Sequence, residues 1–290
     1  MKVTLLGTSA GEMYPGFWCE CPNCAAARRL GGRNVRGNCC AMVDSDVLID
    51  MNEYFFHMAL RLNIRPTQIR TLLVTHPHRD HFAPMLLTQR SMKPILHPLT
   101  DEQRRQCISP CFTRLPLLDI YGNAHVEAAI RAVPGLMESQ EDCRFRFHRI
   151  EDGREERIGH LSFIPVRSRH GSEAGFAHNY IINRGGKTLL YATDTGGYDP
   201  DMLDIVLSHR YNGVVLEGTF GLGAECDTHM NLAKDKAFVK LLREHGCLAD
   251  GARVHLTHIC PHWAPPHDEY ATIVAKEGME LGYDGESFQI

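Results

Sequence analysis

Four short apolar runs, far apart in the chain, each lead into a residue that can bind a metal ion. The runs are rich in Val, Ile and Leu and have the length of strands. They are residues 69–74 before His76, 161–166 before His170, 188–192 before Asp194 and 254–256 before His258. If these strands lie side by side, their carboxyl ends form one rim. The sequence therefore predicts a site that four distant segments assemble at the ends of strands.

The densest group of candidate ligands is the cluster at residues 75–82. It reads Thr-His-Pro-His-Arg-Asp-His-Phe and places three imidazoles and one carboxylate in the order HxHxDH. A catalytic zinc ion usually takes three protein ligands and a water, so the cluster holds too many groups for one ordinary site. In a tight turn, His76 and His78 can converge on one ion while Asp80 and His81 project toward a second. The alternative is a polar turn of hydrogen-bonded histidines. The spacing after an apolar strand favours a two-metal hydrolytic centre.

The remaining ligands of such a centre come from the other three runs. Two ions about 3.5–4 Å apart call for an anionic bridge, and Asp194 suits it because Gly196 and Gly197 let the backbone approach closely. Taken alone, Asp194 is more often a turn residue and His170 a solvated loop histidine. Their occurrence together with His258 and the HxHxDH cluster favours metal binding.

The charge of this centre narrows the substrate class. Two divalent ions, the carboxylates of Asp80 and Asp194 and a bridging hydroxide leave a net charge of about +1 when the imidazoles are neutral. Such a centre suits a monoanionic phosphodiester whose transition state gains negative charge. Lactones and thioesters are also compatible with it.

Composition limits the remaining choices. The chain has 290 residues, 43% of them hydrophobic, enough for one large core, and we expect a single domain over residues 1–290. The chain opens without a signal peptide and has no apolar stretch of about 20 residues, so we expect a cytoplasmic protein without membrane contact. Its 11 cysteines then indicate thiols and metal ligands rather than disulfides. A formal charge of −4 without a basic block predicts no binding of long nucleic acid.

Amphipathic patterning predicts helices that alternate with the strands. The expected helices span residues 53–62, 100–107, 123–133, 232–245 and 268–278. Strands interleaved with helices indicate a layered fold of mixed α and β structure. Residues 108–156 show the least clear pattern of helix or strand. For the region around 98–160 two interpretations stay open, a lid beside the site and an ordinary surface insertion.

With HxHxDH followed by His170, Asp194 and His258, the chain resembles the metallo-β-lactamase superfamily over nearly its whole length. The resemblance implies an α+β fold, a four-layer αββα sandwich with two metal ions on the rim between its sheets. It assigns one ion to His76, His78 and His170, the other to Asp80, His81 and His258, and the bridge to Asp194. Asp80 is expected to act in catalysis as well. The metals stay open among Zn, Mn, Fe and Ni.

The opening Leu-Leu-Gly-Thr-Ser-Ala-Gly and the following CxCxxC resemble PhnP-like phosphodiesterases and PqqB-like proteins. This resemblance implies a structural zinc ion on Cys19, Cys21 and Cys24, with a fourth ligand from the loop after His258. We choose His262, and Cys260 competes with it. Three unligated thiols are the alternative. The intact HxHxDH motif favours the PhnP-like group.

His229, in Asp-Thr-His-Met-Asn-Leu, matches a histidine that lies near the substrate phosphate in the PhnP-like group. The resemblance implies a general acid for the leaving oxygen, whereas a solvated histidine at a helix end is the alternative. Glu217 ends another apolar run, and we do not count it as catalytic. His255 receives no ligand role.

The preferred function is a metal-dependent hydrolase of small or cyclic phosphodiesters, in which a bridging hydroxide attacks phosphorus. One alternative is the hydrolysis of a lactone, thioester or RNA end. Another is a PqqB-like protein that binds a metabolite without hydrolysing it. The expected partner is a small phosphodiester, and the oligomeric state is open, a homodimer included.

Overall fold

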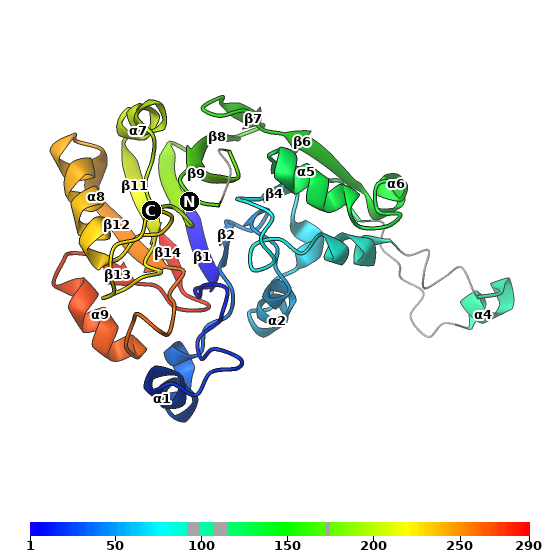
Figure 1. The fold of residues 1–290 in the computed structure, drawn as a ribbon. Helices are drawn as coiled ribbons and strands as arrows, with labels where there is room; N and C mark the ends of the chain where they lie inside the picture. Colours follow the sequence, from blue (N-terminus) through cyan, green and yellow to red (C-terminus); the bar gives the residue numbers. More distant parts are fainter. Residues whose placement is uncertain (92–98, 107–114, 172–174) are drawn as a thin grey trace.

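Two seven-stranded sheets form the centre of the molecule (Figure 1). The computed structural model describes residues 1–91, 99–106, 115–171 and 175–290. The first sheet has the order β14-β1-β2-β3-β4-β5-β6. Its strands are β1 (Lys2–Gly7), β2 (Cys40–Val43), β3 (Val47–Ile49), β4 (Thr71–Leu73), β5 (Leu118–Gly122), β6 (Phe145–Arg149) and β14 (Ser287–Gln289).

The second sheet has the order β13-β12-β11-β10-β9-β8-β7. Its strands are β7 (Glu156–Ile158), β8 (Leu161–Ser168), β9 (Ala177–Arg184), β10 (Lys187–Ala192), β11 (Tyr211–Glu217), β12 (Leu248–Thr257) and β13 (Glu280–Leu281). Strands β10, β11 and β12 are neighbours and parallel, so their carboxyl ends share one edge.

Helices cover the outer face of each sheet (Figure 1). The first sheet is covered by α2 (Tyr54–Arg61), α5 (Ala124–Arg131), α6 (Gln140–Cys143) and the 3₁₀ segment η3 (Pro84–Arg90). The second is covered by α7 (Pro200–Leu207), α8 (Leu232–Glu244) and α9 (His267–Ala275). Within the described residues the other helical segments are α1 (Pro22–Leu30), α4 (Asp101–Arg105), η1 (Gly32–Asn34) and η2 (Pro66–Gln68).

Alternation along the strands creates the layers, because successive side chains point to opposite faces. In β10, Leu189 and Tyr191 belong to the core between the two sheets, whereas Leu190 and Ala192 belong to the core under the helices. In β3, Ile49 faces the opposite sheet and Leu48 faces the helices. The predicted α+β fold, a four-layer αββα sandwich, is confirmed.

Most of the predicted helices are present, with ends shifted by a few residues. The predicted helix at 100–107 is reduced to α4, and its last residue lies outside the described part of the chain. Helices α1 and α7, which are short and begin at Pro22 and Pro200, were not predicted. Of the region 108–156, residues 108–114 lie outside the described residues, and the rest contributes β5, α5, α6 and β6.

The expectation that the four ligand-bearing strands lie side by side is wrong. Strand β4 belongs to the first sheet, and in the second sheet β9 separates β8 from β10 while β11 separates β10 from β12. Apolar patterning defines the faces of a strand but not its neighbours. No helix in the described ranges is long and apolar enough to cross a membrane.

Candidate metal centre

The predicted ligands of the first ion lie together. His76 Nε2 is 2.9 Å from His78 Nδ1, which is 3.3 Å from His170 Nε2. His76 and His78 come from the loop after β4, and His170 comes from the turn after β8. Gly171 follows with a φ of 83°, a conformation that glycine adopts without strain.

The predicted ligands of the second ion form an adjoining group. His81 Nε2 lies 3.2 Å from His258 Nε2 and 3.3 Å from Asp80 Oδ2. Two imidazole nitrogens that face each other across this distance cannot both be unprotonated without repulsion between their lone pairs. The arrangement is typical of ligands that point at one cation.

Asp194 lies between the two groups, where a bridging carboxylate belongs. Its Oδ2 is 3.7 Å from His76 Nε2, 2.5 Å from His81 Nε2 and 3.3 Å from His258 Nε2. This oxygen is buried and has no hydrogen bond of acceptable geometry among the described residues. A buried carboxylate oxygen without such a partner is costly, and a metal ion would satisfy it.

In four of the five candidate ligand histidines, the second ring nitrogen is held by a partner behind it. His81 Nδ1 donates to Asp50 Oδ2 at 2.7 Å, and His258 Nδ1 donates to Thr219 Oγ1 at 2.8 Å. His170 Nδ1 faces the carbonyl oxygen of Thr228 at 3.3 Å, and His76 Nδ1 faces the hydroxyl of Thr75 at 3.1 Å. With Nδ1 of these four rings engaged in this way, each ring would present Nε2 to a metal ion once that nitrogen is unprotonated.

The backbone is strained where the strands deliver these residues. Asp50, Asp194 and His258 have φ angles of 61°, 51° and 58°, the left-handed region that non-glycine residues rarely occupy. Each follows the end of a strand, β3, β10 or β12. Such strain gathers at functional sites when the surrounding fold holds it in place.

The electrostatics of the site favour a cation. Burial works against a charge on His81, yet the carboxylates of Asp194, Asp80 and Asp50 raise its pKa well above its ordinary value. Burial lowers the pKa of His76 well below its ordinary value, so that this ring is neutral. Neutral imidazoles and ionised carboxylates are the donor set of zinc and related divalent ions. The grouped residues could therefore hold divalent metal ions, with His81 giving up its proton when a metal binds.

His229 lies beside the same centre, with Nδ1 3.4 Å from Asp194 Oδ1. Its Nδ1 donates to Glu217 Oε2 at 2.9 Å. Burial opposes a charge on this ring, but Glu217 and Asp194 raise its pKa to about 9. Glu217, at the end of β11, also accepts hydrogen bonds from the backbone N–H of Thr195 and the hydroxyl of Thr219. One buried carboxylate thus orients both His229 and, through Thr219, His258.

Two of these supporting residues had no place in the predicted site. Asp50 was missed, and Glu217 was seen but not counted as catalytic. Both follow the pattern that identified the ligands, because each lies at the end of an apolar strand run. Their partners, however, come from other parts of the chain, so the pattern alone does not reveal the role.

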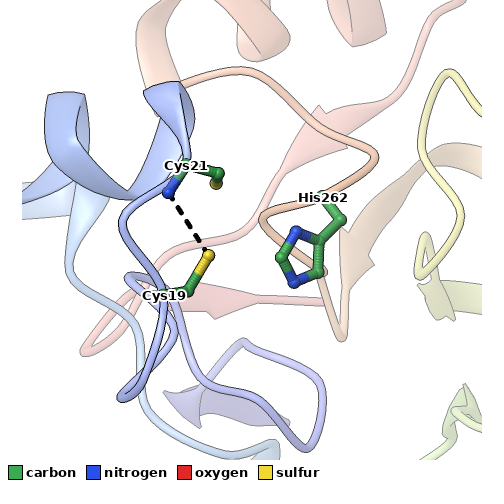
Figure 2. A group of neighbouring side chains, drawn as sticks. All are labelled: Cys19, Cys21 and His262. Atoms are coloured by element: carbon green, nitrogen blue, oxygen red, sulfur yellow. Dashed lines mark hydrogen bonds between the residues drawn. The ribbon is translucent and has the colours of Figure 1, made fainter.

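The predicted structural zinc residues also converge (Figure 2). The ligand atoms of Cys19, Cys21 and His262 lie within 4.8 Å of one another. Cys24 lies beside them, since the space that a Cβ on Gly16 would take is 3.0 Å from Cys19 Cβ and 3.7 Å from Cys24 Sγ. Figure 2 shows the His262 ring turned toward the Cys19 sulfur.

The competing ligand, Cys260, is buried, and burial raises its pKa to about 12. Burial also raises the pKa of Cys24 to about 12, so the pKa does not separate these two thiols as ligands. The position of His262, whose ring lies within 4.8 Å of the Cys19 and Cys21 sulfur atoms, favours it as the fourth ligand.

The chain is similar to a known protein family and to several solved structures. The family model described as the β-lactamase superfamily domain matches residues 45–259. Similar solved structures include a diphosphatase from the PhnP family, with 20% identity, coverage of 99% of this chain and 97% of that one, and a TM-score of 0.69. Zn²⁺-bound PqqB from Methylobacterium extorquens has 16% identity, full coverage of both chains and a TM-score of 0.72.

Human tRNase Z, short form, has 18% identity, coverage of 100% and 99%, and a TM-score of 0.63. A search among curated proteins finds no match. At these identities the solved structures show a shared fold, and the family model covers more than half of the chain. The chain therefore belongs to the metallo-β-lactamase superfamily, a family of metal-binding hydrolase folds.

Proposed function

We propose that the protein is a metal-dependent hydrolase of small or cyclic phosphodiesters. The observation that carries the proposal is the position of His229, which Glu217 holds within 3.4 Å of Asp194 at the edge of the two-metal ligand set. Among the described residues Nε2 of His229 has no hydrogen-bond partner, and the side chain is 18% exposed. This nitrogen is the proposed proton donor to the leaving oxygen.

Different residues of the chain would have different roles in this reaction. A pair of divalent ions bound by the two ligand groups would polarise the phosphoryl group and stabilise negative charge on its oxygens. Glu217 keeps the His229 ring oriented, and His229 donates its proton to the leaving alkoxide. The similarity in fold to a diphosphatase from the PhnP family supports a phosphorus ester as substrate.

A substrate panel tests this proposal. Purified protein reconstituted with Zn or Mn is assayed on bis(p-nitrophenyl) phosphate, a ribose cyclic phosphate, a lactone and a thioester. We expect turnover of the two phosphodiesters. Turnover of only the lactone or the thioester contradicts the proposal, and no turnover at all favours a protein that binds a metabolite without hydrolysing it.

The role of His229 is tested by the choice of leaving group. His229→Ala should slow the hydrolysis of the ribose cyclic phosphate by about 10²–10⁴-fold, the range for loss of a general acid. The effect on bis(p-nitrophenyl) phosphate should be much smaller, because p-nitrophenolate leaves without a proton. Bound metal, measured by atomic emission, should not change. An equal loss on both substrates would exclude the acid role.

A further inference from the structure

A row of aromatic rings leads from the metal centre to the protein surface. The His229 ring is stacked near His258, with centroids 6.0 Å apart and planes at 16°. Phe220 follows at 5.8 Å from His229 and 27°, and Trp263 follows at 5.3 Å from Phe220 and 16°. The outermost ring, Trp263, is 41% exposed. A large ring that is exposed at the end of such a row offers a face to a ligand.

The loop after β11 is shaped around Trp263. A Cβ on Gly223 would lie 2.4 Å from Cε3 of the tryptophan ring, and a Cβ on Gly221 would lie 2.4 Å from its carbonyl oxygen. Gly221 also has a φ of 40°, and Leu222 N–H donates to the Trp263 carbonyl at 2.8 Å. Trp263 is therefore fixed in orientation although it is exposed. A ring held in this way binds with a smaller loss of conformational freedom.

The candidate structural zinc group adjoins both tryptophans along the chain. Trp263 directly follows His262, and the only other tryptophan of the chain, Trp18, directly precedes Cys19. Trp18 is 94% exposed and packs edge-to-face against Phe17. Both tryptophans thus lie one residue from a member of this group. A zinc ion bound to this group would hold in place the backbone segment that carries Trp263.

We propose that the exposed Trp263 ring, backed by Phe220, forms a stacking subsite for a planar ring in the organic group of the substrate, such as a nucleobase. The inference rests on the proposed phosphodiesterase function and narrows it to base-bearing or aryl phosphodiesters. A diester held at the metal centre beside His229 would extend its organic group along the ring row. Stacking accepts any flat ring, because every base presents a π face.

Kinetic selectivity provides the first test. The Zn-loaded protein is assayed on adenosine 2′,3′-cyclic phosphate and on a ribose cyclic phosphate that lacks a base. Trp263→Ala should lower the ratio of kcat/KM between these two substrates by about tenfold, a typical loss for one stacked base, and should act through KM. Trp263→Phe should retain most of the ratio. Leu60→Ala on α2, which removes another highly exposed apolar side chain, should leave it unchanged.

If Trp263→Ala leaves the ratio of kcat/KM between the two substrates unchanged, the proposed subsite is wrong, even when the protein hydrolyses both phosphodiesters. If neither substrate is turned over, the proposed function fails instead, and a binding experiment decides the subsite independently. In Trp18→Phe protein all tryptophan emission comes from Trp263. Adenosine monophosphate should quench this emission and ribose 5-phosphate should not. No quenching, or equal quenching by both, would overturn the inference.

Discussion

At the scale of single residues, the centre depends as much on the groups behind the ligands as on the ligands. Asp50 is fully buried, and it accepts hydrogen bonds from His81 Nδ1 at 2.7 Å and from the Thr75 backbone at 2.8 Å. These bonds fix the tautomer in which His81 Nε2 is free for a metal ion. Carboxylate–histidine pairs of this kind strengthen metal binding.

Asp50→Asn should therefore weaken active-site metal binding by about 10–100-fold. The new amide can turn an N–H group toward His81 Nδ1, which then favours the wrong tautomer. Affinity is measured by competition with a chelating dye. Asp119→Asn is a matched control, because Asp119 makes a 2.7 Å contact with His148 outside the metal centre. Equal affinities for wild type and Asp50→Asn would show that Asp50 does not tune the metal.

At the scale of elements, the two candidate zinc segments join distant parts of the chain. The loop before α1 carries Cys19 and Cys21, α1 itself carries Cys24, and the turn between β12 and α9 carries His262. Asn23, in the first turn of α1, adds a hydrogen bond to the Pro261 carbonyl at 2.8 Å. A zinc ion bound here would fasten the N-terminal loop beside the active-site edge.

Cys21→Ser and His262→Ala should each lose one zinc ion per chain, lower Tm and keep the two active-site metals. Removal of one ligand from a closed tetrahedral site weakens it strongly. Metal content by mass spectrometry and thermal unfolding are the measurements. Cys260→Ser is the informative control and should retain the zinc. Loss of zinc from this variant, with retention in His262→Ala, would make Cys260 the fourth ligand.

At the scale of the whole molecule, a buried cation connects the two ends of the chain. Strand β1 pairs with β14, and Arg36 donates to Thr8 Oγ1 at 2.8 Å, the Gly282 carbonyl at 2.5 Å and His267 Nδ1 at 2.7 Å. Because a guanidinium group only donates, His267 must accept with an unprotonated Nδ1. Burial, then Arg36 and Arg33, lower the pKa of His267 to about 4.

Acid should therefore destabilise the fold through His267. At a pH between its ordinary pKa of about 6.5 and its pKa in the folded protein, His267 binds a proton in the unfolded chain but not in the folded chain. The free energy of unfolding therefore decreases as the pH falls through this range, by at most about 3 kcal/mol. Urea unfolding at pH 7 and pH 4.5 measures this. His267→Asn should show a smaller decrease, whereas the exposed His245→Asn should behave as wild type. Identical decreases in all three proteins would contradict the assignment.

The fold class and the convergence of the ligands could be predicted because they depend on local information. Strand runs and their terminal ligands are visible in one stretch of sequence, and a ligand's chemistry belongs to its side chain. The order of the strands could not be predicted in the same way. Strands β8, β10 and β12 are alike in pattern, and only pairing with β9 and β11 separates them.

The sequence by itself determined which side chains could bind two metal ions and, through HxHxDH and CxCxxC, the family that the chain resembles. Only the tertiary structure decided which groups support those ligands. Asp50 meets His81 across 31 residues, and the Trp263 ring meets Phe220 across two loops that different strands carry. Such contacts depend on the packing of the two sheets, because residue type and local spacing carry no information about which distant segment will lie alongside.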